Sequence, residues 1–348
     1  MMRNSIRWGV IGSGGIARRR TIPEGIIPAQ NAELVSVFDI DPKVNSEVAQ
    51  QFKAKASDSI DDLLEGGIDA VYVATPANKH HEEVLHCARA RKHVLCEKPL
   101  GMTVPEGEEM IAACRHAGVQ LGCGFMMRFE SQNQKALKLI QEGRLGQPVY
   151  GRAQLACWYP PMEGAWRQDP AQGGGGSLID MGGHCIDLLE MFLGTVKKVS
   201  CFTNRTIHRY ISEDSAVAML FFANGAIATV DAFFCIPDES SNNVLELYGS
   251  RGSILAKGTI SQESAGEMIA LLQESDRGYD AQQVRMAAQG LEIGPEPVNI
   301  YRAEIEEFSQ AILGGRPTRI SGEIGLRSQK ILSACYESAK TGKVVEIV

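Results

Sequence analysis

The sequence lacks any pair of cysteines in a C-x-x-C arrangement, although nine cysteines are scattered through its 348 residues. An odd number of cysteines at irregular spacings is typical neither of a disulfide framework nor of a zinc site, so we expect reduced thiols and a cytoplasmic protein. The sequence also lacks an apolar run long enough to cross a bilayer, which argues against a membrane span. Its polar first residues lead straight into an expected strand, so we expect no signal peptide.

An excess of positive charge is missing as well. Lysine and arginine number 35 against 42 aspartates and glutamates, so the formal net charge is −7. Because phosphate contacts need a basic surface, we do not expect a nucleic-acid partner. His80, His81, His86 and His93 raise the question of a metal, but no acidic residue or cysteine accompanies them at a ligand spacing. We interpret them as solvated helix residues and expect no metal site.

The chain is longer than one ordinary core requires, which points to two domains. In the first part strands and helices alternate, and this predicts a parallel, doubly wound sheet. The expected strands there span residues 6–11, 33–38, 68–74 and 119–124. Further on, expected strands follow one another without helices between them, which predicts a mostly antiparallel sheet. We therefore predict an α/β protein with one domain over residues 1–124 and an α+β domain over residues 125–348.

A glycine-rich turn follows the first expected strand. It has the G-x-G-x-x-A spacing of dinucleotide-binding turns, in which the first glycine permits a tight turn and the second lets the backbone approach a pyrophosphate. The small sixth residue, Ala17, allows the helix and strand to pack closely, and the helix start offers free N–H groups to the phosphates. We predict that a dinucleotide binds at Gly12, Ser13, Gly14, Gly15 and Ile16.

Asp39 stands at the end of the second expected strand, about twenty residues past the glycine turn, where an acidic side chain accepts hydrogen bonds from a ribose diol. Its charge would also repel a 2′-phosphate, which favours NAD over NADP. NADP is favoured instead by Arg18, Arg19 and Arg20, because arginines near this position pair with a 2′-phosphate. We interpret them as a solvated helix face, and NADP stays possible.

Two further expected strands end in polar or charged residues. The strand at 68–74 ends at Thr75-Pro76-Ala77-Asn78, and the next one leads into Glu97-Lys98-Pro99. Right-handed crossovers place these turns on the same edge of the sheet as the glycine turn, which is where such sheets bind ligands. The bond before Pro99 is a candidate cis peptide that would aim Lys98 into the cleft.

Asp180 and His184 are four residues apart in the second half, so on a helix they share one face. Histidine titrates near neutral pH and is the usual general base for a hydroxyl proton. A helix start capped by Asp180, with His184 as an ordinary core residue, is the alternative interpretation of this pair alone.

Taken together, these segments resemble the glucose–fructose oxidoreductase and inositol dehydrogenase family over nearly the whole chain. The segments are G-S-G-G-I-A at 12–17, C-E-K-P-L at 96–100, G-F-M-M-R-F at 124–129, W-R at 166–167, G-G-G-S-L-I-D-M-G-G-H-C-I-D at 174–187 and the tail at 334–343. The resemblance implies an N-terminal Rossmann domain and a C-terminal domain with a large open sheet. That sheet face often forms an oligomer interface, so we expect a homodimer or homotetramer.

The resemblance also implies roles for individual residues. His184 would take the hydroxyl proton, Lys98 would stabilise charge on the reacting oxygen, and Asp180 would tune Lys98 or His184. Arg128 and Tyr159 could reach the substrate as well. Met126-Met127 replaces more polar residues, so the pocket wall there is expected to be apolar. The residues expected around the cofactor are Thr75, Pro76, Asn78, His81, Glu97, Lys98, Arg128, Trp166 and Arg167.

The implied function is hydride transfer between a nicotinamide cofactor and a secondary alcohol or ketone of a sugar, polyol or sugar acid. The alternative is a protein of the same fold that senses NAD or a sugar without turnover. The catalytic group does not indicate which sugar reacts, in which direction, or whether the cofactor stays bound.

Overall fold

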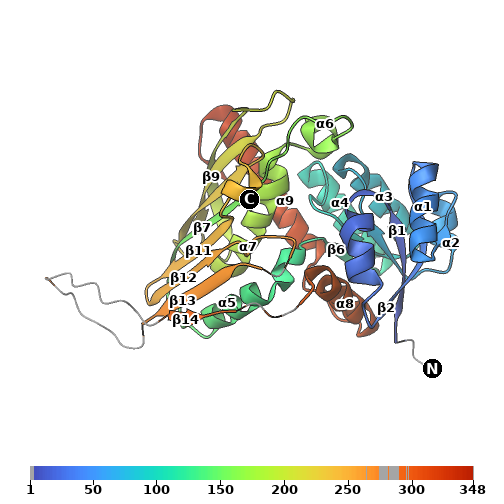
Figure 1. Ribbon diagram of the computed structural model, residues 1–348, viewed down its shortest axis with the longest axis horizontal. Coiled ribbons are helices and arrows are strands. Elements are labelled where there is room, and N and C mark those ends of the chain that lie inside the picture. The colour runs from blue at the N-terminus through green and yellow to red at the C-terminus, as the bar shows by residue number, and fades with distance from the viewer. Residues whose placement is uncertain are drawn as a thin grey trace.

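The computed structural model describes residues 4–263, 265–273, 281, 290–294, 296 and 298–347. Figure 1 shows a helix-flanked sheet at the N-terminal side of the molecule and a broad second sheet with helices against one of its faces. The first sheet is parallel and the second mostly antiparallel, which confirms the predicted fold class. None of the helices in the described ranges has the length and apolar character that a bilayer crossing requires.

The first sheet has six parallel strands in the order β3-β2-β1-β4-β5-β6. The chain first adds β2 and β3 on one side of β1 and then β4, β5 and β6 on the other side. A crevice therefore opens between β1 and β4 at their carboxyl ends. This is the edge at which the sequence predicts ligand binding. The strands are β1 (Ile6–Ile11), β2 (Ala32–Phe38), β3 (Lys55–Ala56), β4 (Ala70–Val73), β5 (His93–Cys96) and β6 (Leu121–Cys123).

Helices cover both faces of this sheet. One face packs against η1 (Ala17–Ile26), α1 (Pro42–Phe52) and α8 (Ile300–Leu313), and the other against α2 (Ile60–Glu65), α3 (Ala77–Arg89) and α4 (Val104–Ala117). The Trp8 indole in β1 donates to the Ser309 hydroxyl in α8 at 3.2 Å. A helix from the second half of the chain therefore completes the first core. The boundary between residues 124 and 125 stays a prediction; it separates the two sheets but leaves α8 with the second half.

Local sequence signals explain where several helices begin and end. Asp41 accepts the backbone N–H groups of Lys43 and Val44 at the start of α1. Thr103 and Glu106 form a reciprocal capping box at the start of α4, and Gly118 ends that helix at φ 72°. These residue types satisfy the free backbone groups of helix ends, so they fix the helices that support the edge turns.

The second sheet has nine strands in the order β14-β13-β12-β11-β7-β10-β9-β8-β15. Among the strand pairings of the described residues in this sheet, only that of β10 with β7 is parallel. Three helices cover its inner face, namely α5 (Ser131–Gln141), α7 (Gly183–Leu193) and α9 (Gly322–Thr341). The strands are β7 (Pro148–Ala156), β8 (Val196–Asn204), β9 (Ser215–Phe222), β10 (Ile227–Phe233), β11 (Val244–Gly249), β12 (Gly252–Lys257), β13 (Glu267–Leu272), β14 (Gly290–Glu292) and β15 (Val345–Glu346).

Candidate active site

Two adjoining hollows lie at the carboxyl edge of the first sheet. The outer cleft, of about 670 Å³, runs along the glycine turn; it is lined by Gly12, Gly14, Gly15, Asp39, Thr75, Pro76, Asn78 and Trp166, among others. The inner cavity, of about 270 Å³, lies between the two sheets; its lining includes Ile16, Thr75, Glu97, Lys98, Trp166, Arg167, Asp180 and His184. Because Thr75 and Trp166 line both, one elongated ligand can extend from the cleft into the cavity.

The glycine turn has the shape that a dinucleotide requires. Gly12 has φ +77°, and a Cβ atom there would lie 2.8 Å from the backbone nitrogen of Thr75. Gly15 has φ +43°, and no heavy atom would lie within 4 Å of its Cβ, so the backbone there is open to a ligand. η1 begins directly after it without a side-chain cap. Free N–H groups therefore face the cleft where a pyrophosphate would sit.

Asp39 lies beside this turn as predicted. Its Oδ2 atom accepts the Gly14 N–H at 2.9 Å, and its Oδ1 atom accepts the Asp41 N–H at 3.1 Å. Two of the three neighbouring arginines are paired with acids: Arg18 donates to Glu47 at 3.0 Å, and Arg20 donates to Glu24 at 2.8 Å. Arg19 Nε donates to the Gly15 carbonyl oxygen in the turn at 3.2 Å. A carboxylate fixed at the cleft, with Arg18 and Arg20 held by acids, favours a ribose diol over a 2′-phosphate.

Asp39→Asn is expected to shift the ratio of NAD affinity to NADP affinity toward NADP by about tenfold or more, since it removes a charged acceptor worth about 1.5–3 kcal/mol. The amide oxygen still accepts the Gly14 N–H, while the bond from the Asp41 N–H outside the turn is lost. Cofactor Kd values from fluorescence titration measure the ratio. Asp41→Asn is the matched control, because asparagine also caps a helix. An unchanged ratio in the Asp39 variant would show that this carboxylate does not select the cofactor.

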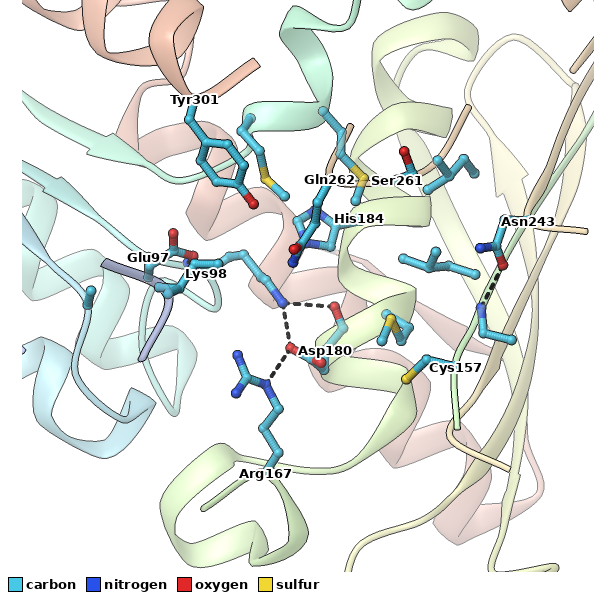
Figure 2. Close-up of a pocket in the computed structure, with 18 of the residues that line it drawn as sticks. Glu97, Lys98, Cys157, Arg167, Asp180, His184, Asn243, Ser261, Gln262 and Tyr301 are labelled. Carbon is cyan, nitrogen blue, oxygen red and sulfur yellow. Dashed lines mark hydrogen bonds and ion pairs between the residues drawn. The ribbon is translucent and has the colours of Figure 1, made fainter. Parts of the chain in front are cut away.

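Lys98 and Asp180 meet in the inner cavity (Figure 2). The Lys98 ammonium donates to Asp180 Oδ1 at 2.6 Å and to the Asp180 carbonyl oxygen at 3.0 Å. Arg167 Nε donates to the same Oδ1 at 3.0 Å. Burial by itself raises the pKa of Asp180, but Arg167 and Lys98 outweigh burial and hold that pKa well below its usual range. Asp180 is thus a permanent anion that fixes two cations from different segments.

His184 lies one helical turn after Asp180 and is only 5% exposed. Its Nδ1 atom has no hydrogen-bond partner within the described part of the chain, and the edge of its ring meets Phe125 at a centroid distance of 6.2 Å. Burial, and then the Lys98 charge, lower the pKa of His184 well below its usual value. The ring is therefore neutral near pH 7 and able to accept a proton. Asp180 is bonded to Lys98 and Arg167, and no described hydrogen bond joins it to His184.

Glu97 lines the inner cavity beside Lys98. Tyr72 donates a short hydrogen bond to its carboxylate, and the Tyr72 oxygen accepts the Thr21 hydroxyl at 2.9 Å. The backbone N–H of Lys98 donates to the other Glu97 oxygen at 3.2 Å. Burial raises the pKa of Glu97. These contacts fix the β5 turn, in which the Lys98–Pro99 peptide bond is cis.

The sequence did not reveal two side chains that hold the Thr75 turn. Glu83 accepts the Thr75 hydroxyl at 2.6 Å, and burial raises the pKa of Glu83 to about 7. His80 is buried, with its ring nitrogens 2.9 Å from the Pro99 carbonyl oxygen and 3.0 Å from that of Thr75. The interpretation of His80 as a solvated residue is therefore wrong: it sits between two turns of the site. Among the described residues, no group of three or more His, Cys, Asp or Glu side chains is arranged to hold a metal ion.

Four predicted contact residues do not line either hollow. His81 lies 2.9 Å from Glu109. Tyr159 packs against Phe234 at a ring-centroid distance of 4.9 Å, and burial raises the pKa of its hydroxyl. Arg128 forms an ion pair with Asp187. The fourth residue, Ser13, is buried within the glycine turn.

The Arg128–Asp187 pair joins the segment after β6 to α7. Arg128 Nη2 and Nε donate to Asp187 Oδ1 at 2.7 and 2.9 Å, and the Asp187 side chain is only 3% exposed. The pair supports the helix that carries His184 rather than facing a ligand. Removal of one partner of such a pair leaves a buried charge without compensation.

Arg128→Ala is accordingly expected to lower the free energy of unfolding by about 3–5 kcal/mol, as measured by urea denaturation. The double variant Arg128→Met with Asp187→Leu replaces both charges by apolar groups and is expected to recover most of that loss. If the single variant unfolds at the wild-type urea concentration, the pair does not stabilise this junction.

Several lining residues of the inner cavity were not predicted from the sequence. They come from the ends of β7 and β12, the turn before β11 and the start of α8, and include Cys157, Asn243, Ile260, Ser261, Gln262 and Tyr301. No spacing rule marks such positions, because they depend on how the second sheet meets the first. Met126 and Met127 line the cavity as the expected apolar wall.

The fold and these two hollows define a two-domain nicotinamide-dependent oxidoreductase. Residues 6–125 match the family model described as "Oxidoreductase family, NAD-binding Rossmann fold", and residues 133–255 match the "GFO/IDH/MocA C-terminal domain". The chain is 31% identical to 1,5-anhydro-D-fructose reductase of Ensifer adhaerens over 98% of both chains. It belongs to the GFO/IDH/MocA oxidoreductase family, as the resemblance predicted.

Two further similarities span almost the full length. The chain is 28% identical to myo-inositol 2-dehydrogenase of Thermotoga maritima over 98% of each chain. It superimposes on the crystal structure of aldose-aldose oxidoreductase from Caulobacter crescentus with a TM-score of 0.87 and 26% identity, covering 98% of this chain and 99% of that one. The protein is thus an NAD-binding oxidoreductase of this family.

Proposed function

We propose that the protein transfers hydride between NAD and a secondary alcohol or ketone of a sugar, polyol or sugar acid, with Lys98, Asp180 and His184 at the reacting centre. The observation that carries the proposal is the 2.6 Å pair of Lys98 and Asp180, which forms beside His184 in a cavity continuous with the outer cleft. The relatives named for 1,5-anhydro-D-fructose and myo-inositol support a substrate of this class.

The residues of the chain have separate tasks in this reaction. NAD supplies a nicotinamide ring that accepts hydride from the carbinol carbon, or returns it. Neutral His184 takes the hydroxyl proton in the oxidation direction and gives it back in reduction. The Lys98 ammonium donates a hydrogen bond to the same oxygen and stabilises the negative charge that grows there. Asp180 holds that ammonium in place and thereby acts on Lys98 rather than directly on His184.

The outer cleft would hold the rest of the cofactor. The pyrophosphate position is bordered by Gly12, Gly14 and Gly15, and the position of the ribose diol by Asp39. The passage to the inner cavity is bordered by Thr75 and Trp166. Pro76 and Asn78 line the same cleft, while Ile16, Glu97 and Arg167 line the inner cavity where the nicotinamide end would enter. Apolar walls from the methionines would keep water from the reacting carbon.

A screen of neutral sugars, inositols and sugar acids with NAD and with NADP, followed at 340 nm, tests the proposal. The expected result is cofactor reduction with at least one member of these classes. Mass spectrometry of cofactor released on denaturation provides the control for tightly retained NADH, which would hide turnover; in that case keto-sugars replace the alcohols. Binding of NAD with no turnover in either direction would favour the sensing alternative over the enzyme.

The oligomer predicted from the resemblance also belongs to this proposal. The outer face of the second sheet carries apolar side chains, with Phe202 76% exposed, Met219 53% exposed and Ile227 41% exposed. We propose that this face joins two or four copies of the chain, since such a patch is a typical interaction surface. Light scattering on the purified protein measures the mass directly.

A further inference from the structure

Asn243 occupies an unusual position on the wall of the inner cavity that lies opposite the first sheet. It directly precedes β11 and has φ +44°, in the left-handed region that side chains other than asparagine and aspartate seldom adopt. The strand that follows is fixed in the sheet, since Leu245 pairs with Ala153 in β7. The side chain of Asn243 is thus held at the cavity by the backbone around it.

The orientation of its carboxamide is fixed by chemistry. The backbone N–H of Ala156, which has only a proton to offer, lies 3.0 Å from one end of the amide, so that end is the oxygen. The Ser241 hydroxyl donates to the same oxygen at 2.6 Å. The amide nitrogen must then lie on the opposite side. No described hydrogen bond uses it, and Figure 2 shows it on the side of Asn243 toward which His184 lies.

The wall around Asn243 is uncharged among the described lining residues. It consists of Leu155, Ala156 and Cys157 from β7 and of Ile260, Ser261 and Gln262 after β12. The charged lining residues are Glu97, Lys98, Arg167 and Asp180, and none of them belongs to this wall. A carboxylate or phosphate on the remote end of a substrate would require an arginine or lysine there. The wall instead offers uncharged donors, namely the oriented Asn243 amide nitrogen, the Ser261 hydroxyl and the Gln262 amide, among apolar groups.

We propose that Asn243 is a specificity residue: its amide nitrogen donates to a hydroxyl or ring oxygen of an uncharged sugar whose reacting carbon lies at Lys98 and His184. This inference rests on the proposed function and narrows it, because it selects neutral sugars and polyols over sugar acids. Asn243 plays no part in the proton transfer. It fixes which carbon of the sugar reaches the catalytic group.

The test compares Asn243→Gly with Asn242→Gly in the full-length protein with NAD. Glycine tolerates the left-handed backbone, so Asn243→Gly removes the donor without backbone strain, together with the oxygen that accepts from Ala156 and Ser241. Asn242 is the exposed neighbour and gains the same backbone freedom when replaced. The probes are D-glucose, D-galactose and D-xylose, the acids D-glucuronate and D-galacturonate, and the monodeoxy analogues of whichever neutral sugar reacts fastest. Thermal unfolding and the Kd for NADH are measured for each protein.

For the wild type we expect kcat/KM at least about tenfold higher for a neutral sugar than for its uronate. For Asn243→Gly we expect a loss of about 10- to 100-fold with the parent sugar, mainly in KM, and little loss with the one deoxy analogue that lacks the partner oxygen. Asn242→Gly should match the wild type, and Kd for NADH should stay constant in both.

A purely structural role for Asn243 predicts a different pattern. In Asn243→Gly, kcat/KM would then fall by the same factor for the parent sugar and for every deoxy analogue, or it would equal the wild-type value for all of them. Either result overturns the inference, as does a preference for the uronates, while the proposed function stands. A wild-type protein silent toward every sugar and ketone in both directions overturns the proposed function instead, and the role of Asn243 with it.

Discussion

Lys98→Met is expected to lower kcat by about 10²–10³-fold, the range observed when one preorganised donor to a developing oxyanion is removed. Methionine keeps most of the length and volume of the side chain but cannot donate to the reacting oxygen. It also leaves Asp180 with Arg167 as its remaining described cation partner. Because the ammonium acts mainly on charge that exists in the transition state, kcat and kcat/KM should fall together.

Stopped-flow turnover with the best sugar from the screen measures kcat, and fluorescence titration measures the Kd for NADH, which should change little. Lys138→Met provides a matched control, because the Lys138 side chain is 77% exposed on α5 and lines neither hollow. Asp180→Asn is expected to lower kcat as well, and the double variant should be little worse than Lys98→Met alone, since residues that act as a unit are not additive. A Lys98→Met enzyme with near wild-type kcat would remove Lys98 from the reacting centre.

The elements of the fold that the sequence predicts are those with strong local signals. The apolar run at 6–11 is β1 within the same bounds, and the dipeptide Asn224-Gly225, a strong local hairpin signal, joins β9 to β10. The strands β13, β14 and β15 were not predicted. β15 contains only Val345 and Glu346 at an edge, and β13 carries no turn signal comparable to Asn-Gly. Pairing with neighbours in the sheet, rather than local preference, determines these strands.

The site shows the same division between local and long-range information. Gly12 and Asp39 follow directly from strand ends, whereas Lys98 and Asp180 are 82 residues apart and no local pattern pairs them. Their proximity was an implication of the family resemblance alone. His80 was misread because its helix position says nothing of the turns that close over it. Arg128 follows a strand end, and only the structure reveals its ion pair with the buried Asp187.

His184→Gln is expected to lower kcat by about 10²–10⁴-fold in the oxidation direction, the usual range for loss of a general base. Glutamine is polar and of similar size but takes no proton near neutral pH. The NADH Kd should be preserved, since His184 lies at the inner cavity and not along the outer cleft. His116→Gln replaces an exposed histidine on α4 and should leave turnover unchanged.

The pH dependence distinguishes a proton acceptor from a residue that merely fills space. Burial and Lys98 lower the pKa of His184, so the neutral, proton-accepting ring persists below the ordinary histidine value of about 6.5. In the wild type, kcat/KM for oxidation should therefore fall only as the pH drops below that value, through the lowered pKa.

The lowered pKa of His184 also makes the free energy of unfolding depend on pH. The unfolded chain binds the proton at a higher pH than the folded chain does, so the stability of the fold decreases as the pH falls through this range. In His184→Gln the acidic limb of the rate profile and this part of the acid sensitivity of unfolding should both disappear. An acidic limb that persists unchanged in the variant would assign the proton to another group.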